Sequence, residues 1–278
     1  MKSPLQTLNP LNLARTAFPA LRHRNYRLFF AGQGASLVGT WMQQMALGWL
    51  VYRITHSELL LGTVGFSSQI MTFMITPFAG VLADRASRRR LIVMTQALAM
   101  IQALLLAALT LFHLVTVWQI VLLSLVLGLV NAFDIPIRQS FVLELLDKRE
   151  DLPNAIALNS LLVNSAKLIG PSVAGILIAM YGEGFCFLVN GISYAAVIAA
   201  LLAMKLEPRP IPPSEANVLQ NMKEGILYAA KFPPMRAVLT LMSLASLFGV
   251  SSMVLLPVFA KDILHGGPST LGFMLTSS

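Results

Sequence analysis

Long stretches without Asp, Glu, Lys or Arg recur along the chain, separated by short charged segments. A helix needs about 20 apolar residues to cross the hydrocarbon core of a bilayer. Leu28–Tyr52 and Leu59–Ala83 each fit one crossing. Leu91–Phe133 is too long for one crossing, so we expect His113 and the polar segment Thr116–Gln119 to divide it into a third and a fourth span.

Two more stretches predict a fifth and a sixth span, Leu152–Gly182 and Phe185–Met204. The fifth contains a single charged residue, Lys167. A seventh span is predicted over Ala237–Ala260, and a last apolar stretch begins near Ser269 and is too short for a full crossing. We therefore expect an all-α membrane protein, because helices satisfy their own backbone hydrogen bonds within lipid.

The polar segments between the spans suggest four parts. Residues 1–27 form a charged arm, and residues 28–206 form a transmembrane bundle of six helices. The longest polar connection, residues 207–236, holds six prolines and is predicted to be a linker. Residues 237–278 then begin a second bundle, with its first helix and part of the next one.

The composition narrows the class of protein. Hydrophobic residues make up 56% of the chain and charged residues only 12%, against about 25% in ordinary soluble domains. Too few charges remain to cover the surface of a soluble enzyme or a nucleic-acid-binding domain. Cys186 is the only cysteine, which excludes a disulfide scaffold, and the four histidines are scattered. We expect no metal site, no cofactor and no nucleic-acid partner.

The net charge of +8 is distributed unevenly over the predicted loops. Seventeen of the 20 Lys and Arg residues fall on the side of the N-terminal arm, while Arg53 and Lys261 fall on the opposite side and Lys167 lies within a span. Positively charged loops of membrane proteins stay in the cytoplasm. The N-terminus is therefore predicted to be cytoplasmic.

The connection after the second span carries a glycine, an acid and a run of arginines: Gly80, Asp84, Arg85, Arg88, Arg89 and Arg90. This spacing resembles the signature loop between helices two and three of the major facilitator superfamily, with Ser87 where that pattern usually has glycine. A cluster of basic anchors at the membrane surface is the alternative. It explains the arginines but gives Gly80 and Asp84 no role.

The fifth span contains Gly170, Pro171 and Gly175. The segment resembles the Gly-Pro motif in helix five of superfamily exporters, although Ala166 and Ala174 replace two of its usual glycines. Glycine thins a helix, and proline removes a backbone hydrogen bond and permits a bend. The alternative is a kinked packing helix without any meaning for the direction of transport.

Residues 36–52 and 131–139 are similar to the superfamily branch that contains bacterial siderophore (enterobactin) exporters. Members of the superfamily usually have two six-helix bundles. The resemblance therefore implies that this chain is the front part of a longer protein and lacks most of the second bundle as its partner. It also implies a monomer in the bacterial inner membrane that works by alternating access between the two bundles.

The implied function is proton-driven efflux of a small amphiphilic molecule, siderophore-like or drug-like. An importer of a small metabolite and a non-functional fragment are the alternatives. A channel or an embedded enzyme fits less well, because the sequence has no repeated filter motif and no zinc-protease, serine-hydrolase or P-loop signature.

Polar residues within the spans mark candidate substrate positions. Ser160, Asn164 and Lys167 share one face of the fifth span with Pro171, and we expect this face to line the central cavity. Lys167 is predicted to bind an anionic or carbonyl-bearing group of the substrate, or to pair with an acid of the second bundle. Its long side chain reaching a lipid headgroup is the alternative.

The first span carries a second polar face, made of Gln33, Ser36, Thr40 and Gln43. Substrate contact and interhelical hydrogen bonding are equally consistent with this pattern.

Asp134 and Arg138 lie four residues apart near the cytoplasmic end of the fourth span. The resemblance implies that Asp134 forms a latch with Arg85 or Arg88, and that Asp84 faces the second bundle. If protons drive the transport, the titrating group is Asp134, Lys167 or a residue beyond Ser278.

Overall fold

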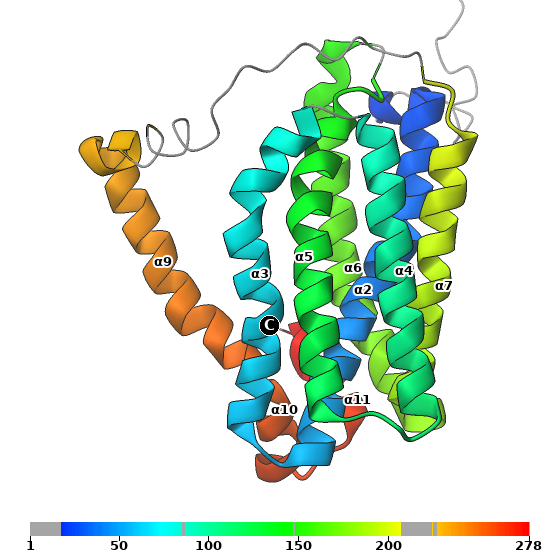
Figure 1. Ribbon diagram of the computed structural model, residues 1–278, viewed down its shortest axis with the longest axis vertical. Coiled ribbons are helices and arrows are strands. Elements are labelled where there is room, and N and C mark those ends of the chain that lie inside the picture. The colour runs from blue at the N-terminus through cyan, green and yellow to red at the C-terminus, as the bar shows by residue number, and fades with distance from the viewer. Residues whose placement is uncertain (1–17, 85–86, 147, 207–223, 225–226, 278) are drawn as a thin grey trace, which may run out of the picture.

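The structure is a computed structural model, and it describes residues 18–84, 87–146, 148–206, 224 and 227–277. Six long helices lie side by side and alternate in direction (Figure 1). They are α2 Arg24–Thr55, α3 Glu58–Asp84, α4 Arg88–Leu111, α5 Val117–Val142, α6 Leu152–Tyr181 and α7 Glu183–Ala203. The described residues contain no strand, so the all-α class predicted from the sequence is confirmed.

The division of the long apolar stretch into two spans is also confirmed. α4 ends at Leu111, and His113 follows in a left-handed conformation with φ 58°. Thr116 then caps α5: its backbone N–H donates to Gln119 Oε1 at 2.8 Å, and its hydroxyl accepts from the Gln119 N–H. This reciprocal capping box satisfies two backbone donors at the start of the helix.

The helix boundaries differ from the apolar stretches at both ends of α2. The helix begins at Arg24 and continues to Thr55, so only His56 and Ser57 separate it from α3, where the charge pattern predicts about six residues. The reason is that a helix can extend beyond the hydrocarbon core, where arginine side chains are solvated. An uncharged stretch therefore marks the membrane-embedded part of a helix and misses its ends.

Beyond the first six helices, α9 spans Pro233–Val254. It is followed by the short helix α10 Leu256–Val258, a π-helix at Phe259–Ile263 and α11 Pro268–Ser277. α9 thus begins before the predicted seventh span, Ala237–Ala260, and ends before it, and the polar pair Lys261–Asp262 lies within the π-helix. A single-turn π-helix often marks a functional position.

Helix contacts order the bundle. α2 lies in its centre and packs against α6 and α7, α4 packs against α5 and α7, and α3 packs against α5. The α3–α5 contact depends on Gly128, because a Cβ at this position would lie 2.2 Å from the Ser68 carbonyl oxygen. Thr72 adds a hydrogen bond of 3.0 Å from its hydroxyl to the Gly128 carbonyl.

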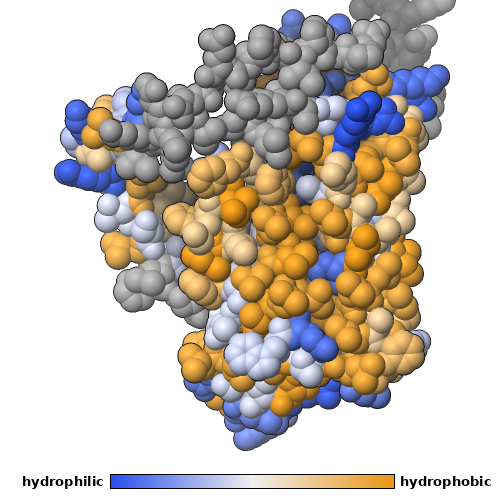
Figure 2. Space-filling model, in the orientation of Figure 1, coloured by the Kyte–Doolittle hydropathy of each residue, from blue (hydrophilic) through white to orange (hydrophobic). Residues whose placement is uncertain are grey.

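The exterior is apolar. Figure 2 shows a broad hydrophobic surface over the helices that face the viewer. Large apolar side chains exposed on the described helices include Leu98, Leu105, Leu122 and Ile192. Five of the described helices, α3 to α7, are long and apolar enough to cross a membrane. α2 is less apolar than these because its uncharged part contains three glutamines. An apolar surface of this extent is the surface of a multi-pass membrane protein.

Charges are concentrated at the ends of the bundle. Arg24, Arg88, Lys148 and Lys205 lie at or beside the ends of α2, α4, α5 and α7 that meet at one end of the bundle, which we call the basic end. Arg53 and Lys261 lie at the opposite end. The unequal distribution of charge along the sequence therefore corresponds to the two ends of one bundle.

Candidate functional site

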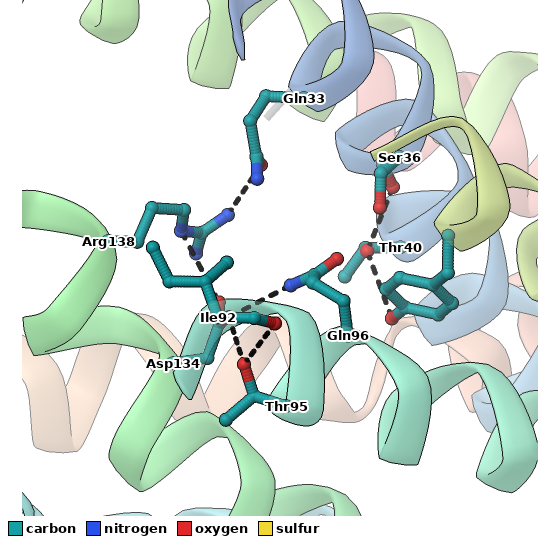
Figure 3. Close-up of polar contacts among 9 residues, drawn as sticks. Gln33, Ser36, Thr40, Ile92, Thr95, Gln96, Asp134 and Arg138 are labelled. Atoms are coloured by element: carbon teal, nitrogen blue, oxygen red, sulfur yellow. Dashed lines mark hydrogen bonds and ion pairs between the residues drawn. The ribbon is translucent and has the colours of Figure 1, made fainter. Parts of the chain in front are cut away.

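A buried carboxylate lies inside the bundle, in the half nearer the basic end. Asp134 on α5 is only 4% exposed, although it lies within a membrane-spanning helix. Its Oδ1 accepts hydrogen bonds of 2.8 Å from the Thr95 hydroxyl and from Gln96 Nε2, both on α4. Its Oδ2 lies 3.4 Å from Arg138 Nε, one turn further along α5 (Figure 3). Burial of this charge is compensated by one ion pair and two hydrogen bonds.

Arg138 connects this carboxylate to α2. Its guanidinium donates to Gln33 Oε1 at 2.8 Å, so Asp134, Arg138 and Gln33 form a chain across three helices (Figure 3). Two buried amide atoms of the cluster, Gln33 Nε2 and Gln96 Oε1, have no hydrogen-bond partner within the described part of the chain. The cluster can therefore accept one more donor and one more acceptor.

A second set of buried amides lies further along α2. Asn190 Nδ2 donates to Gln43 Oε1 at 2.7 Å, and Gln43 Nε2 donates to Gln102 Oε1 at 3.3 Å. These contacts join α7, α2 and α4. Gln43 and Gln102 are each 3% exposed, and Asn190 is fully buried.

The predicted polar face of the first span therefore points into the six-helix bundle. Ser36 is buried, and Thr40 donates to the Ser36 carbonyl and lies 3.5 Å from the Tyr194 hydroxyl (Figure 3). Of the two roles that the pattern allows, the geometry supplies interhelical hydrogen bonds for Gln33, Thr40 and Gln43. Such contacts stabilise a membrane bundle by about 0.6 kcal/mol each.

Arg88 and Asp134, two residues of the predicted latch, do not pair with each other, and pairing of Asp134 with Arg85 stays a prediction. Arg88 pairs with Glu144 at 2.5 Å, and Asp134 pairs with Arg138 of its own helix instead of with Arg88. Asp134 lies deeper in the bundle, where Arg138 can reach it along the same face. Arg89 donates to the Leu202 carbonyl at 2.9 Å and joins α4 to α7. The surroundings of Gly80, the side chain of Asp84 and the whole of Arg85 lie outside what the structure describes.

The predicted face of α6 is largely open. Ser160 and Asn164 are exposed, Lys167 is partly exposed, and Pro171 is buried. Lys167 Nζ lies 5.8 Å from the centre of the Trp41 ring on α2, within the range of a cation–π contact. The lysine lies near the midpoint of the 30-residue helix. A charge at this depth costs about 2.5–3.5 kcal/mol on insertion scales, which favours a polar surrounding over lipid.

Gly170 and Gly175, the two glycines of the Gly-Pro motif in α6, pack against different helices. A Cβ at Gly170 would lie 2.6 Å from Trp41 Cβ on α2. A Cβ at Gly175 would lie 3.0 Å from the Pro268 carbonyl oxygen, and one at Gly272 would lie 2.8 Å from the Pro171 carbonyl oxygen. The motif therefore allows α6 to approach α2 on one side and α11 on the other.

A cluster at the opposite end was missed by the sequence reasoning. The Tyr52 hydroxyl of α2 donates to the Asp262 carboxylate, and Lys261 Nζ lies 5.6 Å from the centre of the Tyr52 ring. Beside them, Arg53 makes a two-pronged ion pair with Glu183, with N–O distances of 2.7 and 3.2 Å. The only sequence signal is that Arg53 and Lys261 are the two cations predicted on that side.

Comparison with known proteins agrees with this architecture. Residues 15–278 match the family described as transmembrane secretion effector, which covers nearly the whole chain. The chain belongs to this family. This membership confirms the major facilitator superfamily predicted from the arginine-rich loop and the Gly-Pro motif, and it places the chain among transporters rather than enzymes.

Individual relatives of this secretion-effector chain are transporters from bacteria. It is 26% identical to the staphyloferrin A transporter of Staphylococcus aureus over 90% of this chain and 63% of that protein. It is 21% identical to macrolide efflux protein A of Streptococcus pyogenes over 89% of this chain and 62% of that protein. It is 24% identical to the multidrug efflux pump Tap of Mycolicibacterium fortuitum over 88% of this chain and 60% of that protein. The chain thus spans less than two thirds of these relatives.

Proposed function

We propose that the complete protein is a secondary active transporter that exports a small amphiphilic molecule by alternating access. This proposal rests on one observation, which is the location of the contacts between the first bundle and the described helices that follow it. Their contacts lie in the half of the molecule away from the basic end. A pair of bundles joined at one end and separated at the other is one of the two end states of alternating access.

The joined end is built from several contacts. Tyr52 binds Asp262, and a Cβ at Gly48 would lie 3.6 Å from Pro257 Cγ. α11 packs along α6, where the hydroxyls of Ser172 and Thr276 lie 2.7 Å apart. These contacts close the opposite end.

The separated end is defined by α9. Figure 1 shows this helix in orange, close to α3 at its lower end and diverging from α3 toward the basic end. Its described side chains from Met235 to Leu244 are exposed, including Val238, Leu241 and Met242. On α6, Asn164 is exposed and Lys167 is partly exposed.

We propose that the basic end faces the cytoplasm of a bacterium, with the protein in the inner membrane. The concentration of Lys and Arg at that end supports this orientation. With it, the structure corresponds to a state open to the cytoplasm, which is the state in which an exporter takes up its cargo. We further propose that the complete protein works as a monomer, with residues 237–277 contributing the first helices of its second bundle.

Asp134 is our candidate for the proton-binding group. Gln96 donates its amide N–H to the carboxylate, and after rotation of the amide it could offer its free Oε1 to the protonated acid. Both protonation states can therefore be satisfied by one neighbour. The charged or titratable groups near Asp134 are Arg138 on α5 and Tyr194 on α7, while α2 and α4 contribute the uncharged Gln33, Thr95 and Gln96.

The relatives support export and suggest the probes. Their names include a staphyloferrin A transporter, a macrolide efflux protein and a multidrug efflux pump. The test uses inverted membrane vesicles that contain the complete gene product and carry an imposed proton gradient. We expect labelled macrolide or staphyloferrin A to accumulate inside them, and a protonophore to abolish the accumulation. Accumulation only in right-side-out vesicles would instead identify an importer.

A further inference from the structure

Lys167 lies near the midpoint of α6, and no acidic partner for it lies within the described part of the chain. Five of the described acids are already engaged: Asp134 with Arg138, Glu144 with Arg88, Glu183 with Arg53, Asp151 with His23 and Asp262 with Tyr52. Within the described residues, no carboxylate lies within ion-pair distance of Lys167.

Its described neighbour is aromatic. The ammonium group lies over the Trp41 ring, whose negative face attracts a cation without neutralising its charge. Gly170 holds the two helices together at this level, because a Cβ there would collide with Trp41 Cβ. The ring and the lysine are therefore fixed relative to each other by backbone packing.

Polar groups extend this site along the exposed face of α6. Asn164 Nδ2 donates to the Ser160 carbonyl at 2.8 Å, which fixes the amide one turn before Lys167. Gln44 of α2 is exposed and lies one turn beyond Trp41. A ligand at this position would meet one positive charge, one flat apolar surface and a few neutral hydrogen-bonding groups.

We propose that Lys167 and Trp41 form a subsite for the carboxylate of an amphiphilic substrate, with the apolar part of that substrate against the Trp41 ring. This inference rests on the proposed transport function and adds a substrate class to it. The single lysine matches a single negative charge. An ion pair formed away from bulk water also discriminates strongly against an uncharged analogue.

The experiment uses a matched pair of probes, 2-naphthoate and 2-naphthamide, which have the same ring and differ in charge. Binding to the purified complete gene product is followed by quenching of Trp41 fluorescence, in a background in which every other tryptophan of the complete protein, Trp49 and Trp118 included, is replaced by Phe. We expect the carboxylate to bind about tenfold more tightly than the amide, the ratio that one charge-assisted contact gives. We expect Lys167→Gln to abolish this preference and Lys167→Arg to keep most of it.

Lys261→Gln is the matched control, because Lys261 also lies over an aromatic ring but at the opposite end. This variant should leave the preference for naphthoate unchanged. Equal binding of the two probes by the otherwise unchanged background protein would overturn the proposal, and this measurement needs no Lys167 variant to fold. A preference that survives Lys167→Gln would overturn it as well.

The two proposals can fail separately. If inverted vesicles accumulate macrolide while naphthoate and naphthamide bind equally, the transport function stands and the carboxylate subsite is wrong. If naphthoate is preferred through Lys167 but no vesicle preparation accumulates any probe, the subsite stands and the transport proposal is wrong. Lys167 could instead form a structural ion pair with an acid elsewhere in the protein. In that case Lys167→Gln would have a lower melting temperature, and the background protein would bind naphthoate and naphthamide equally. That result would overturn the subsite.

Discussion

The hydroxyl of Tyr52 donates a hydrogen bond to the carboxylate of Asp262, and this contact joins the first bundle to the segment that precedes α11. Tyr52 is 3% exposed, whereas Asp262 lies on the exposed side of the contact. The neighbouring Lys261 lies over the same ring. Two adjacent residues of the π-helix therefore contact one tyrosine, and in the transport cycle that we propose both contacts break when the opposite end opens.

The first prediction concerns this contact. Tyr52→Phe should shift the protein toward a state open at the opposite end, because a hydrogen bond to a charged group is lost there. A contribution of about 1.5–3 kcal/mol to the closed state corresponds to roughly a tenfold or larger shift in the ratio of the two states. The measurement is the yield of a disulfide between cysteines placed at Gly48 and Pro257 in a Cys186→Ala background. The yield should fall in Tyr52→Phe.

Tyr181→Phe is the control for that experiment, because Tyr181 is exposed and its ring packs on Phe185. It should leave the disulfide yield unchanged. An unchanged yield in Tyr52→Phe would mean that the Tyr52–Asp262 contact does not stabilise the closed end.

The second prediction separates coupling from substrate binding. Asp134→Asn keeps the size of the side chain and one acceptor oxygen, but it cannot release a proton. Vesicles with this variant should lose proton-driven accumulation by on the order of 100-fold, as expected when a group that transfers protons is removed. Exchange of labelled for unlabelled substrate, which needs no net proton movement, should persist. Thr95→Val, which removes a hydrogen bond to the same carboxylate but keeps the acid, should retain accumulation. Proton-driven accumulation by Asp134→Asn would rule out this residue as the coupling group.

Most of the helices follow from the sequence, because a span is a local property of about 20 consecutive residues. The break near His113 was predicted for this reason, whereas α5 begins at Val117, within the polar segment that was expected to separate the two spans. The helical period places Ser160 and Asn164 on one face of α6, and both are exposed, while their role in a substrate cavity stays a prediction.

The sequence does not predict in the same way which residues of different helices contact each other. The period of α2 places Gln33 and Gln43 on one face, but it does not say whether that face meets substrate or another helix. Gln43 forms hydrogen bonds with Asn190 and Gln102, which lie 147 and 59 positions away along the chain. Tyr52 and Asp262 are 210 positions apart, at the last residue of the first predicted span and just beyond the seventh, so no helical period relates them.

The third prediction concerns the approach of α11 to α6. Gly272→Ala places a methyl group 2.8 Å from the Pro171 carbonyl oxygen, so the two helices must separate. The closed state at the opposite end should be destabilised by about 1–3 kcal/mol, the usual effect of overpacking. The cysteine pair at positions 48 and 257 reports this as a lower disulfide yield. Gly267→Ala, where a Cβ meets nothing within 4 Å, should not change the yield. Equal yields from both variants would show that Gly272 does not set the helix separation.

The fourth prediction addresses stability of the first bundle. A Cβ at Gly128 would lie 2.2 Å from the Ser68 carbonyl oxygen, and backbone cannot move aside as a side chain can. Gly128→Ala should therefore separate α3 from α5 and destabilise the protein by about 1–3 kcal/mol or more. A lower melting temperature in detergent would be the readout. Gly62→Ala on α3, the helix that packs against Gly128, places a Cβ that meets nothing within 4 Å and should not lower the melting temperature. A melting temperature of Gly128→Ala equal to that of Gly62→Ala would contradict the α3–α5 packing.

The fifth prediction uses the unequal burial of the Arg53–Glu183 pair. The Glu183 side chain is 7% exposed, whereas that of Arg53 is 50% exposed. Removing the arginine leaves a buried carboxylate without its partner, whereas removing the carboxylate leaves an arginine that water can still solvate. Arg53→Gln should therefore destabilise the protein more than Glu183→Gln, and Arg53→Gln/Glu183→Gln should be more stable than Arg53→Gln alone. Because half of the arginine is solvated, we expect a coupling of about 1 kcal/mol in a double-mutant cycle of melting in detergent. Strictly additive effects of the two substitutions would show that the pair contributes no interaction energy of its own.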